Sequence, residues 1–293
     1  MHQSPYAAPP GPWSAGRPAV VGHRGARGLT PENTVASMRT AIGVGVPAIE
    51  LDVLLTADEQ VVVWHDPVLL ADKCRSTDVD YTGARVDELT LAQLRTIDVG
   101  SSTLTAYPRQ RSAPGERIPT LAEVFAATAD TDLWWVIEVK VDPTDPRERA
   151  TRHTLLDGVL ATVTQAGVRE RAFIHSFDWA VLERSRALDP LLPRSALAVV
   201  GQTFAPGSEW LGSVRWEDHP DDLAGAAEEL GAVVVSPDFP SCTAELVEKA
   251  HARGIAVLPW TVNDPVVFGR LAAAGADGLV TDVPDEMLAL PPR

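Results

Sequence analysis

Two carboxylates stand inside one apolar run of the sequence, and their spacing points to chemistry. Glu50 and Asp52 lie in the run 48–54, whose other residues are all apolar. Side chains of a strand alternate between its two faces, so these acids share one face and lie about 7 Å apart. Two acids this close repel each other and lose solvation free energy unless a cation compensates them. The pattern therefore indicates a metal site.

A histidine follows in the next β-branched run, 61–66. Only five residues, 56–60, separate the two runs, which is too few for a helical crossover. Such a short connection predicts a β-hairpin with antiparallel strands. A turn centred near residues 57 and 58 would bring His65 level with Glu50, so we expect His65 to meet the two acids in space.

The composition fits one large globular domain and excludes several classes of partner. The chain has 293 residues, of which 45% are hydrophobic and 22% charged. A net charge of -15 argues against a nucleic-acid groove or an anionic membrane surface, although it leaves a zwitterionic lipid substrate open. With only Cys74 and Cys242, we expect ordinary thiols and no disulfide framework or cysteine metal cage.

The first eighteen residues are rich in proline and lack the basic and apolar regions of a secretory signal. We expect them to form a flexible tail. No later run is long and apolar enough to span a bilayer, so the sequence predicts a cytoplasmic protein without stable membrane insertion. Nothing in the sequence indicates its oligomeric state.

Beyond the tail, strand-like runs alternate with helical patterns. The strand-like runs are 19–23, 48–54, 133–140, 171–176, 194–200, 232–236, 255–260 and 278–281, with 61–65 as the return strand of the hairpin. The helical patterns run from Thr30 to about Gly43 and over 146–165, 178–188, 223–230, 243–253 and 265–274. Eight βα units predict an α/β fold, a (β/α)8 TIM barrel over residues 19–293.

The main rival fold is a doubly wound sheet, but no glycine-rich phosphate loop follows the first strand. The stretch 67–119 carries few strong strands and a short helical pattern over 91–97. We interpret it as a small insertion that follows the hairpin and lies over the mouth of the barrel.

Chemistry in such barrels is performed where the strands end at their carboxyl face. The polar and aromatic residues expected at those ends are His23, Arg24, Glu50, Asp52, Glu138, Lys140, His175, Trp260 and Asp282. Glu138 and Lys140 repeat the spacing of Glu50 and Asp52, which adds a third carboxylate beside a cation. Asp282, like Asn263, is a weaker candidate that we expect to be structural.

These residues occur in motifs that resemble the glycerophosphodiester phosphodiesterase family. The motifs are His23-Arg24-Gly25, Pro31-Glu32-Asn33-Thr34, Ile49-Glu50-Leu51-Asp52-Val53, Val63-Trp64-His65-Asp66-Pro67, Ile137-Glu138-Val139-Lys140, Trp260-Thr261-Val262-Asn263 and Thr281-Asp282-Val283-Pro284. Their order and spacing extend over nearly the whole chain. The resemblance implies a (β/α)8 barrel with a small insertion after the His-Asp motif, which agrees with the stretch 67–119.

The resemblance also implies roles for individual residues. Glu50, Asp52 and Glu138 would bind a divalent metal, Mg²⁺ or Ca²⁺, and oxygen-only ligands suit such hard ions independently of the family. His23 and His65 would serve as general acid and base, in an order that the sequence leaves open. The remaining candidates are substrate-binding residues: Arg24 and Lys140 for the phosphate, Trp260 for the glycerol or another apolar face, and His175 in the pocket wall.

The function predicted is metal-dependent hydrolysis of a small glycerophosphodiester to glycerol 3-phosphate and an alcohol. In this family the glycerol hydroxyl is thought to attack phosphorus, giving a cyclic diester that water opens. The alternative is phospholipase D-like cleavage of a lysophospholipid or related lipid, for which Trp210, Trp216 and Phe204 could build an apolar slot.

Other interpretations also remain. The chain could be a catalytically inactive binding protein, although no metal carboxylate or histidine is missing, or a metal-dependent barrel acting on sugars. The three acids could instead form a salt-bridge network with arginines. In that case Arg24 and Lys140 would merely neutralise them.

Overall fold

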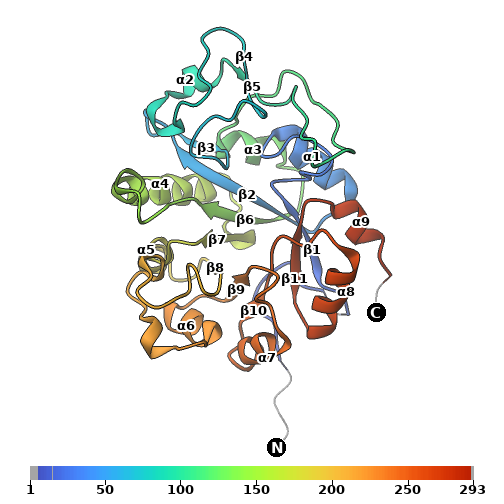
Figure 1. The fold of residues 1–293 in the computed structure, drawn as a ribbon, viewed down its shortest axis with the longest axis vertical. Helices are drawn as coiled ribbons and strands as arrows, with labels where there is room; N and C mark the ends of the chain where they lie inside the picture. The colour runs from blue at the N-terminus through green and yellow to red at the C-terminus, as the bar shows by residue number, and fades with distance from the viewer. Residues whose placement is uncertain (1–5, 15, 292–293) are drawn as a thin grey trace, which may run out of the picture.

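The computed structural model describes residues 6–14 and 16–291. Within these residues, eight parallel strands form a ring covered by helices, as Figure 1 shows. The strands are β1 (Ala19–His23), β2 (Ala48–Leu55), β6 (Trp134–Val139), β7 (Ala172–Ser176), β8 (Arg194–Ala198), β9 (Val234–Pro237), β10 (Ala256–Val257) and β11 (Gly278–Thr281). The helices that follow them are α1 (Val35–Val44), α3 (Leu121–Ala127), α4 (Pro146–Gln165), α5 (Trp179–Leu188), α6 (Leu223–Leu230), α7 (Ala244–Ala252), α8 (Pro265–Ala274) and α9 (Pro284–Ala289). The predicted (β/α)8 barrel is confirmed.

The ring closes between its two end strands, β10 and β11. The strands pair in the order β10-β9-β8-β7-β6-β2-β1-β11. The backbone amide of Asp277 donates to the carbonyl of Val257 at 3.0 Å, and that of Val280 donates to Pro259 at 3.0 Å. All eight strands therefore end at one face of the barrel, where chemistry is expected.

Local capping residues set the helix bounds. The predicted bounds of α4, α6 and α8 are those of the structure. The first helix begins at Val35 rather than near Thr30, because the Thr34 side chain accepts from the amide of Ser37 and so forms the N-cap. The sequence pattern did not predict α3, a helix of 7 residues that begins with the capping box of Thr120 and Glu123. It also missed the short α9.

The predicted hairpin is confirmed, with a register one residue away from the expected one. β2 pairs antiparallel with β3 (Val61–Val63), with Val53 opposite Val63. The amide of Trp64 donates to the carbonyl of Asp52 at 3.0 Å. Trp64 is therefore level with Asp52, and His65 is level with Leu51 instead of Glu50.

Alternating strand residues fill two apolar layers. The inner cluster consists of Val21, Ala48, Val136, Phe173, Val234, Ala256, Leu258 and Val280. On β2, Ile49, Leu51 and Val53 point the other way and join the larger cluster between strands and helices. Glu50 and Asp52 share the inner face with Ala48, which places both acids above the inner cluster.

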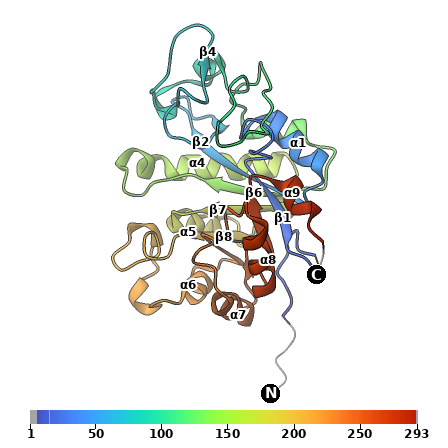
Figure 2. The ribbon, with the colours of Figure 1, turned by 45° about the vertical axis from the view of Figure 1, so that its right-hand side comes forward.

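The insertion, residues 67–119, projects beside β3 at one end of the molecule, as Figures 1 and 2 show. It contains β4 (Arg75–Ser76), β5 (Ile97–Asp98), α2 (Leu91–Leu94) and the 3-10 turn η1 (Val86–Glu88). A separate apolar cluster, which includes Leu69, Leu94, Ile97 and Ile118, joins it to Trp64. The insertion thus has a small core of its own.

The described part of the N-terminal segment lies against the barrel. The Tyr6 ring stacks on His251 with ring centroids 3.8 Å apart, and its hydroxyl donates to Asp277 at 3.1 Å. The Trp13 ring stacks on Phe173 at 6.0 Å. Residues 1–5 and 15, which belong to the predicted tail, lie outside the described residues. Within the described part of that segment, Tyr6 and Trp13 therefore contact residues of the barrel.

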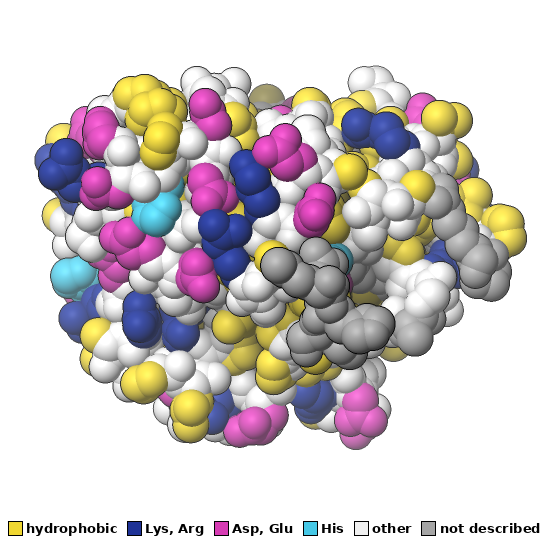
Figure 3. All heavy atoms as spheres, turned by 90° about the horizontal axis from the view of Figure 1, so that it is seen from below, with side chains coloured by type: hydrophobic (Ala, Val, Ile, Leu, Met, Phe, Trp, Pro, Cys, Tyr) yellow, Lys and Arg dark blue, Asp and Glu magenta, His cyan; other side chains and the backbone are white. Residues whose placement is uncertain are grey.

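Charges of both signs are mixed on the surface seen in Figure 3. Aspartate and glutamate side chains lie there among lysines, arginines and hydrophobic residues, without a basic patch on that face. Across the described ranges, no helix combines the length and apolar character that crossing a membrane requires.

Candidate active site

The register of adjacent strands brings the predicted site residues together. His23 on β1 pairs with Glu50 on β2. Asp52 on β2 pairs with Glu138 on β6, which in turn pairs with His175 on β7. Because neighbouring strands lie about 4.8 Å apart, these five side chains form one cluster at the carboxyl face.

The three carboxylates of Glu50, Asp52 and Glu138 are buried and close together. Each offers an oxygen within 4.8 Å of the others, and their residues are 3%, 1% and 9% exposed. Burial and the neighbouring charges of Asp52 and Glu138 raise the pKa of Glu50 well above its usual value. Two of the oxygens, Glu50 Oε1 and Asp52 Oδ1, are buried without a hydrogen-bond donor from any described residue.

Two cations partly compensate this cluster. Arg24 Nε lies 3.2 Å from Asp52 Oδ2, and Lys140 Nζ lies 2.9 Å from Glu138 Oε1 and 3.6 Å from Asp52 Oδ1. Burial alone would raise the pKa of Asp52, but Arg24, His65 and Lys140 outweigh it and hold the pKa well below its usual range. Asp52 is therefore ionised.

The salt-bridge interpretation accounts for only part of the cluster. Asp52 and Glu138 have cationic partners, whereas the contacts of Glu50 are the backbone amide of Arg24 at 3.0 Å and His23 Nε2 at 3.9 Å. Its other oxygen has no donor among the described residues. Unpartnered buried carboxylate oxygens in an oxygen-only set fit a hard divalent cation. The three acids thus fit the predicted metal.

His23 is held by a carboxylate through one ring nitrogen. Its Nδ1 lies 2.6 Å from Asp282 Oδ1. Burial alone would raise the pKa of Asp282, but the hydrogen bond from His23 and the charge of Arg27 hold it well below its usual range. Asp282 is therefore an acceptor, and Nδ1 must carry the proton. Burial, with the charge of Arg24, lowers the pKa of His23, so the ring is neutral near pH 7 and Nε2 has a free lone pair.

His65 shows the same arrangement. Its Nδ1 lies 2.9 Å from Asp66 Oδ1, and Asp66 Oδ2 accepts from Lys73 Nζ at 2.5 Å. Burial raises the pKa of Asp66, but the hydrogen bonds from His65 and Lys73 outweigh it and lower the pKa well below its usual value. Both candidate histidines thus donate from Nδ1 to an ionised aspartate and keep Nε2 for other partners.

A cavity of about 180 Å³ collects these groups. Its lining consists of His23, Arg24, Arg27, Glu50, His65, Glu138, Lys140, His175, Phe177, Leu197, Trp260, Thr261 and Val280. The sequence assigned nine residues as metal ligands, general acid or base, or substrate-binding residues, and eight of them line this cavity. The ninth, Asp52, contacts Arg24 and Lys140. The predicted convergence of His65 with the acids is confirmed despite the shifted register.

The far wall of the cavity is aromatic and neutral. Burial lowers the pKa of His175 to about 3, and its Nδ1 lies 2.8 Å from Ser195 Oγ. Trp260 donates from Nε1 to the carbonyl of Ser236 at 3.0 Å and meets Phe177 edge-on at 5.5 Å. Trp210, from the long loop after β8, also meets Phe177 edge-on, with ring centroids 6.0 Å apart.

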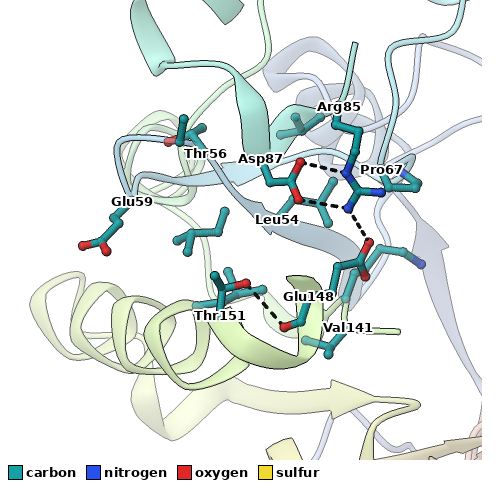
Figure 4. A pocket seen from close by; sticks show the side chains of 14 residues that line it. Leu54, Thr56, Glu59, Pro67, Arg85, Asp87, Val141, Glu148 and Thr151 are labelled. Atoms are coloured by element: carbon teal, nitrogen blue, oxygen red, sulfur yellow. Dashed lines mark hydrogen bonds and ion pairs between the residues drawn. The ribbon is translucent and has the colours of Figure 1, made fainter. Parts of the chain in front are cut away.

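A second cavity of about 160 Å³ lies between the insertion and α4. In Figure 4, Arg85 reaches across it, with hydrogen bonds to Asp87 at 2.9 Å and to Glu148 at 3.1 Å. Its other walls are largely apolar, and Lys140 is the one predicted site residue that lines it as well. The histidines and the metal-fitting acids belong to the first cavity.

The sequence reading missed several residues that contact the predicted ones. Asn33 Nδ2 donates to Asp52 at 2.8 Å, and Glu32 pairs with Arg24 at 2.7 Å and with Lys73 at 2.9 Å. The sequence pattern predicted only the start of a helix in this segment. The polar side chains of Glu32 and Asn33, directly before α1, were the signal in the sequence that could have identified these contacts.

The sequence predicted a structural role for Asp282 and did not predict the group of side chains that surrounds it in the site. Besides His23, Asp282 accepts from Asn263 at 2.6 Å and from the Tyr107 hydroxyl at 2.9 Å. Arg27 lies against the Tyr107 ring, with its Cζ 5.1 Å from the ring centre. No local sequence pattern signals Tyr107, because it belongs to the insertion.

Comparison with known proteins agrees with this geometry. The sequence profile described as the glycerophosphoryl diester phosphodiesterase family matches residues 23–286. A glycerophosphodiester phosphodiesterase from Caldanaerobacter subterraneus subsp. tengcongensis is 29% identical over 275 residues, which cover 92% of this chain and 96% of that protein. One from Bacillus subtilis is 29% identical over 277 residues, covering 93% and 86%.

A solved structure gives the same result. A protein from Silicibacter pomeroyi DSS-3 that carries the same family name is 33% identical, with 94% of each chain covered and a TM-score of 0.85. The profile match, the relatives and this structure agree over nearly the whole chain. The protein belongs to the glycerophosphoryl diester phosphodiesterase family.

Proposed function

We propose that the protein is a metal-dependent phosphodiesterase that hydrolyses small glycerophosphodiesters to glycerol 3-phosphate and an alcohol. The observation that carries this proposal is one cavity that joins three buried carboxylates with two histidines, each held by an aspartate through Nδ1. Hydrolysis of a phosphodiester requires neutralised charge, a deprotonated nucleophile and a protonated leaving oxygen. The cavity has a group for each requirement.

Glu50, Asp52 and Glu138 are the residues that would hold the divalent metal. Glu50 Oε1 and Asp52 Oδ1, which accept no hydrogen bond from a described residue, support this assignment. Their oxygen-only set suits Mg²⁺ and Ca²⁺ alike, so the choice between the two is left to measurement. When bound, the cation supplies positive charge that stabilises the phosphoryl oxygens as negative charge develops on them.

His23 is assigned as the general base and His65 as the general acid. The neutral His23 ring has its Nε2 lone pair ready to take a proton from the attacking hydroxyl, of glycerol or of water. The oxygen of that hydroxyl bonds to phosphorus, and the bond to the departing alcohol breaks. His65, protonated at both ring nitrogens, gives its Nε2 proton to the departing oxygen. Where glycerol is the attacking group, water then opens the cyclic diester to glycerol 3-phosphate, with His65 taking a proton from the water and His23 returning its proton to the glycerol oxygen. The side chain of His65 is 29% exposed, against 12% for His23, so it lies nearer to the solvent into which the alcohol leaves.

Arg24 and Lys140 are proposed to hold the phosphoryl oxygens, as the sequence suggested. Trp260 forms a flat apolar wall for glycerol or the alcohol, and the neutral His175 closes the cavity beside it. The cytoplasmic location, a small-molecule substrate and the absence of a nucleic-acid partner remain predictions from the sequence within this proposal.

The lipid-cleaving alternative has less support. Of the three residues expected to form an apolar slot, Phe204 is 1% exposed and stacks beneath the surface on Trp179 at 6.2 Å. Phe204 therefore cannot line a slot for an acyl chain. Trp210 meets Phe177, which lines the cavity, edge-on.

The test is release of glycerol 3-phosphate from glycerophosphocholine by purified protein. We expect EDTA to abolish release and Mg²⁺, Ca²⁺ or Mn²⁺ to restore it. Lysophosphatidylcholine is assayed in parallel for choline release. Turnover of the lysolipid alone would favour the lipid-cleaving alternative, and folded protein inactive on both with every metal would refute the proposal.

A further inference from the structure

Arg27 has hydrogen-bond donors that the structure leaves unused. Among the described residues, neither of its Nη atoms donates a hydrogen bond, and Nη1 lies 3.9 Å from Asp282 Oδ1. Its Nε contacts Glu32, a carboxylate that Arg24 and Lys73 also contact. Three cations thus share one close carboxylate. The charge of Arg27 is the least compensated of the three, because its second acid lies 3.9 Å away, whereas Asp52 lies 3.2 Å from Arg24 and Asp66 lies 2.5 Å from Lys73.

The guanidinium of Arg27 is held in one orientation. Glu32 forms an ion pair with Nε, and the Tyr107 ring centre lies 5.1 Å from Cζ. The backbone is fixed as well, because Gln110 Nε2 donates to the carbonyl of Arg27 at 2.7 Å and the amide of Arg111 donates to Leu29 at 2.8 Å. A planar guanidinium fixed in this way loses little entropy when it binds a ligand.

Arg27 also lies close to the proposed general base. Arg27 and His23 both approach the same oxygen, Asp282 Oδ1, and both line the cavity of about 180 Å³. Unused Nη donors in a planar fork match two oxygens of a phosphoryl group or a carboxylate. Since the proposed reaction places a phosphoryl group within reach of His23, the ligand class that fits Arg27 is the phosphoryl anion.

We propose that Arg27 binds the phosphoryl oxygens of the substrate, and that Glu32 and Tyr107 are positioning residues that hold its guanidinium in place. This inference rests on the proposed function. It adds a third cation to the two that the sequence suggested, and it makes the insertion part of the substrate site through Tyr107.

The test compares Arg27→Gln and Arg27→Lys with the wild type under full metal loading. Glycerophosphocholine hydrolysis gives kcat and KM, and inorganic phosphate and glycerol serve separately as competitive inhibitors. Arg27→Gln should lower kcat/KM about 100-fold and raise the inhibition constant of phosphate at least about tenfold, with glycerol inhibition unchanged. Arg27→Lys should restore part of the loss. Arg75→Gln, which removes an exposed arginine of the insertion away from this site, is the control and should change nothing.

Two variants of Tyr107 separate stacking from hydrogen bonding. Tyr107→Phe keeps the ring and loses the donor to Asp282, whereas Tyr107→Leu loses both. If the ring positions Arg27, phosphate inhibition should weaken in Tyr107→Leu beyond its value in Tyr107→Phe.

The outcomes distinguish this inference from the proposed function. An active wild type with unchanged phosphate inhibition in a folded Arg27→Gln variant would overturn the inference and leave the proposed function standing. Weaker inhibition by glycerol instead of phosphate would place Arg27 at the glycerol and also overturn it. An inactive wild type, by contrast, would refute the proposed function itself.

Discussion

His23 donates a hydrogen bond from Nδ1 to Asp282 Oδ1 at 2.6 Å, across 259 positions of the sequence. The two residues lie at the carboxyl ends of β1 and β11, which pair in parallel. This contact fixes the tautomer of His23 and turns Nε2 toward the carboxylate cluster. The first and last strands of the barrel thus build one functional unit.

Loss of the Asp282 charge should slow the reaction. Asp282→Asn removes the carboxylate that stabilises the protonated form of His23, so we expect kcat to fall about 10- to 100-fold. KM and the melting temperature should change little by comparison. Steady-state kinetics and thermal unfolding measure these quantities. Asp285→Asn, an exposed change on α9, is the control, and equal activity of the two variants would contradict the assigned role of Asp282.

Removal of either histidine should abolish turnover without unfolding the protein. His23→Ala and His65→Ala each eliminate one proton transfer, which is worth about 10²- to 10⁴-fold in rate. His153→Ala, on the exposed face of α4, is the control. Circular dichroism checks the fold and glycerol 3-phosphate release checks the rate. Retained activity in both active-site variants would remove them from the mechanism.

Glu50→Gln should have opposite effects on metal binding and on metal-free stability. The neutral side chain weakens the ligand set, so metal affinity measured by calorimetry should fall about 10- to 100-fold. It also removes a buried charge that Asp52 and Glu138 repel, so the variant should melt at a higher temperature than the wild type in EDTA. Glu245→Gln, exposed on α7, is the matched change. Unchanged metal affinity would refute Glu50 as a ligand.

Asp178 should make stability depend on pH. This buried N-cap of α5 lies 3.0 Å from Arg152, yet burial raises its pKa to about 6. A raised pKa means that the folded state binds the proton more tightly than the unfolded state. The contribution of Asp178 to stability should therefore be fully present below about pH 4 and fall by about 2 kcal/mol as the pH rises to about 6.

The Asp178→Asn variant isolates that effect. Asparagine caps a helix as well as aspartate does but does not titrate. The free energy of unfolding of the wild type, minus that of the variant, should therefore decrease between pH 4.5 and 7. Urea unfolding at both pH values provides the difference, and a constant value would show that Asp178 titrates normally.

The barrel could be predicted because its signals are local. Alternating apolar strands and capped helices appear within windows of about ten residues, and Glu50 and Asp52 were visible as acids inside one such run. The hairpin register was predicted one residue away from the observed one, because the exact turn at residues 57 and 58 decides it. That error did not matter for His65, whose side chain still reaches the cavity.

The partners of the catalytic candidates could not be predicted in the same way. The contacts of Asp282 with His23 and of Tyr107 with Asp282 join residues 259 and 175 positions apart. Such pairs depend on barrel closure and on the path of the insertion, which no periodicity encodes. Asp282 was visible as a strand-end acid, but its role depended on what it faced.

The contacts of residues 107–111 with the loop after β1 limit how the insertion can be exchanged. Its apolar cluster marks it as a unit that could be grafted from a homologue. Tyr107, Gln110 and Arg111 nevertheless touch Arg27, Leu29 and Asp282 directly. A chimera that takes its insertion from a homologue should therefore retain residues 107–111 of this protein. The exchanged segment should end before residue 107 rather than at residue 119.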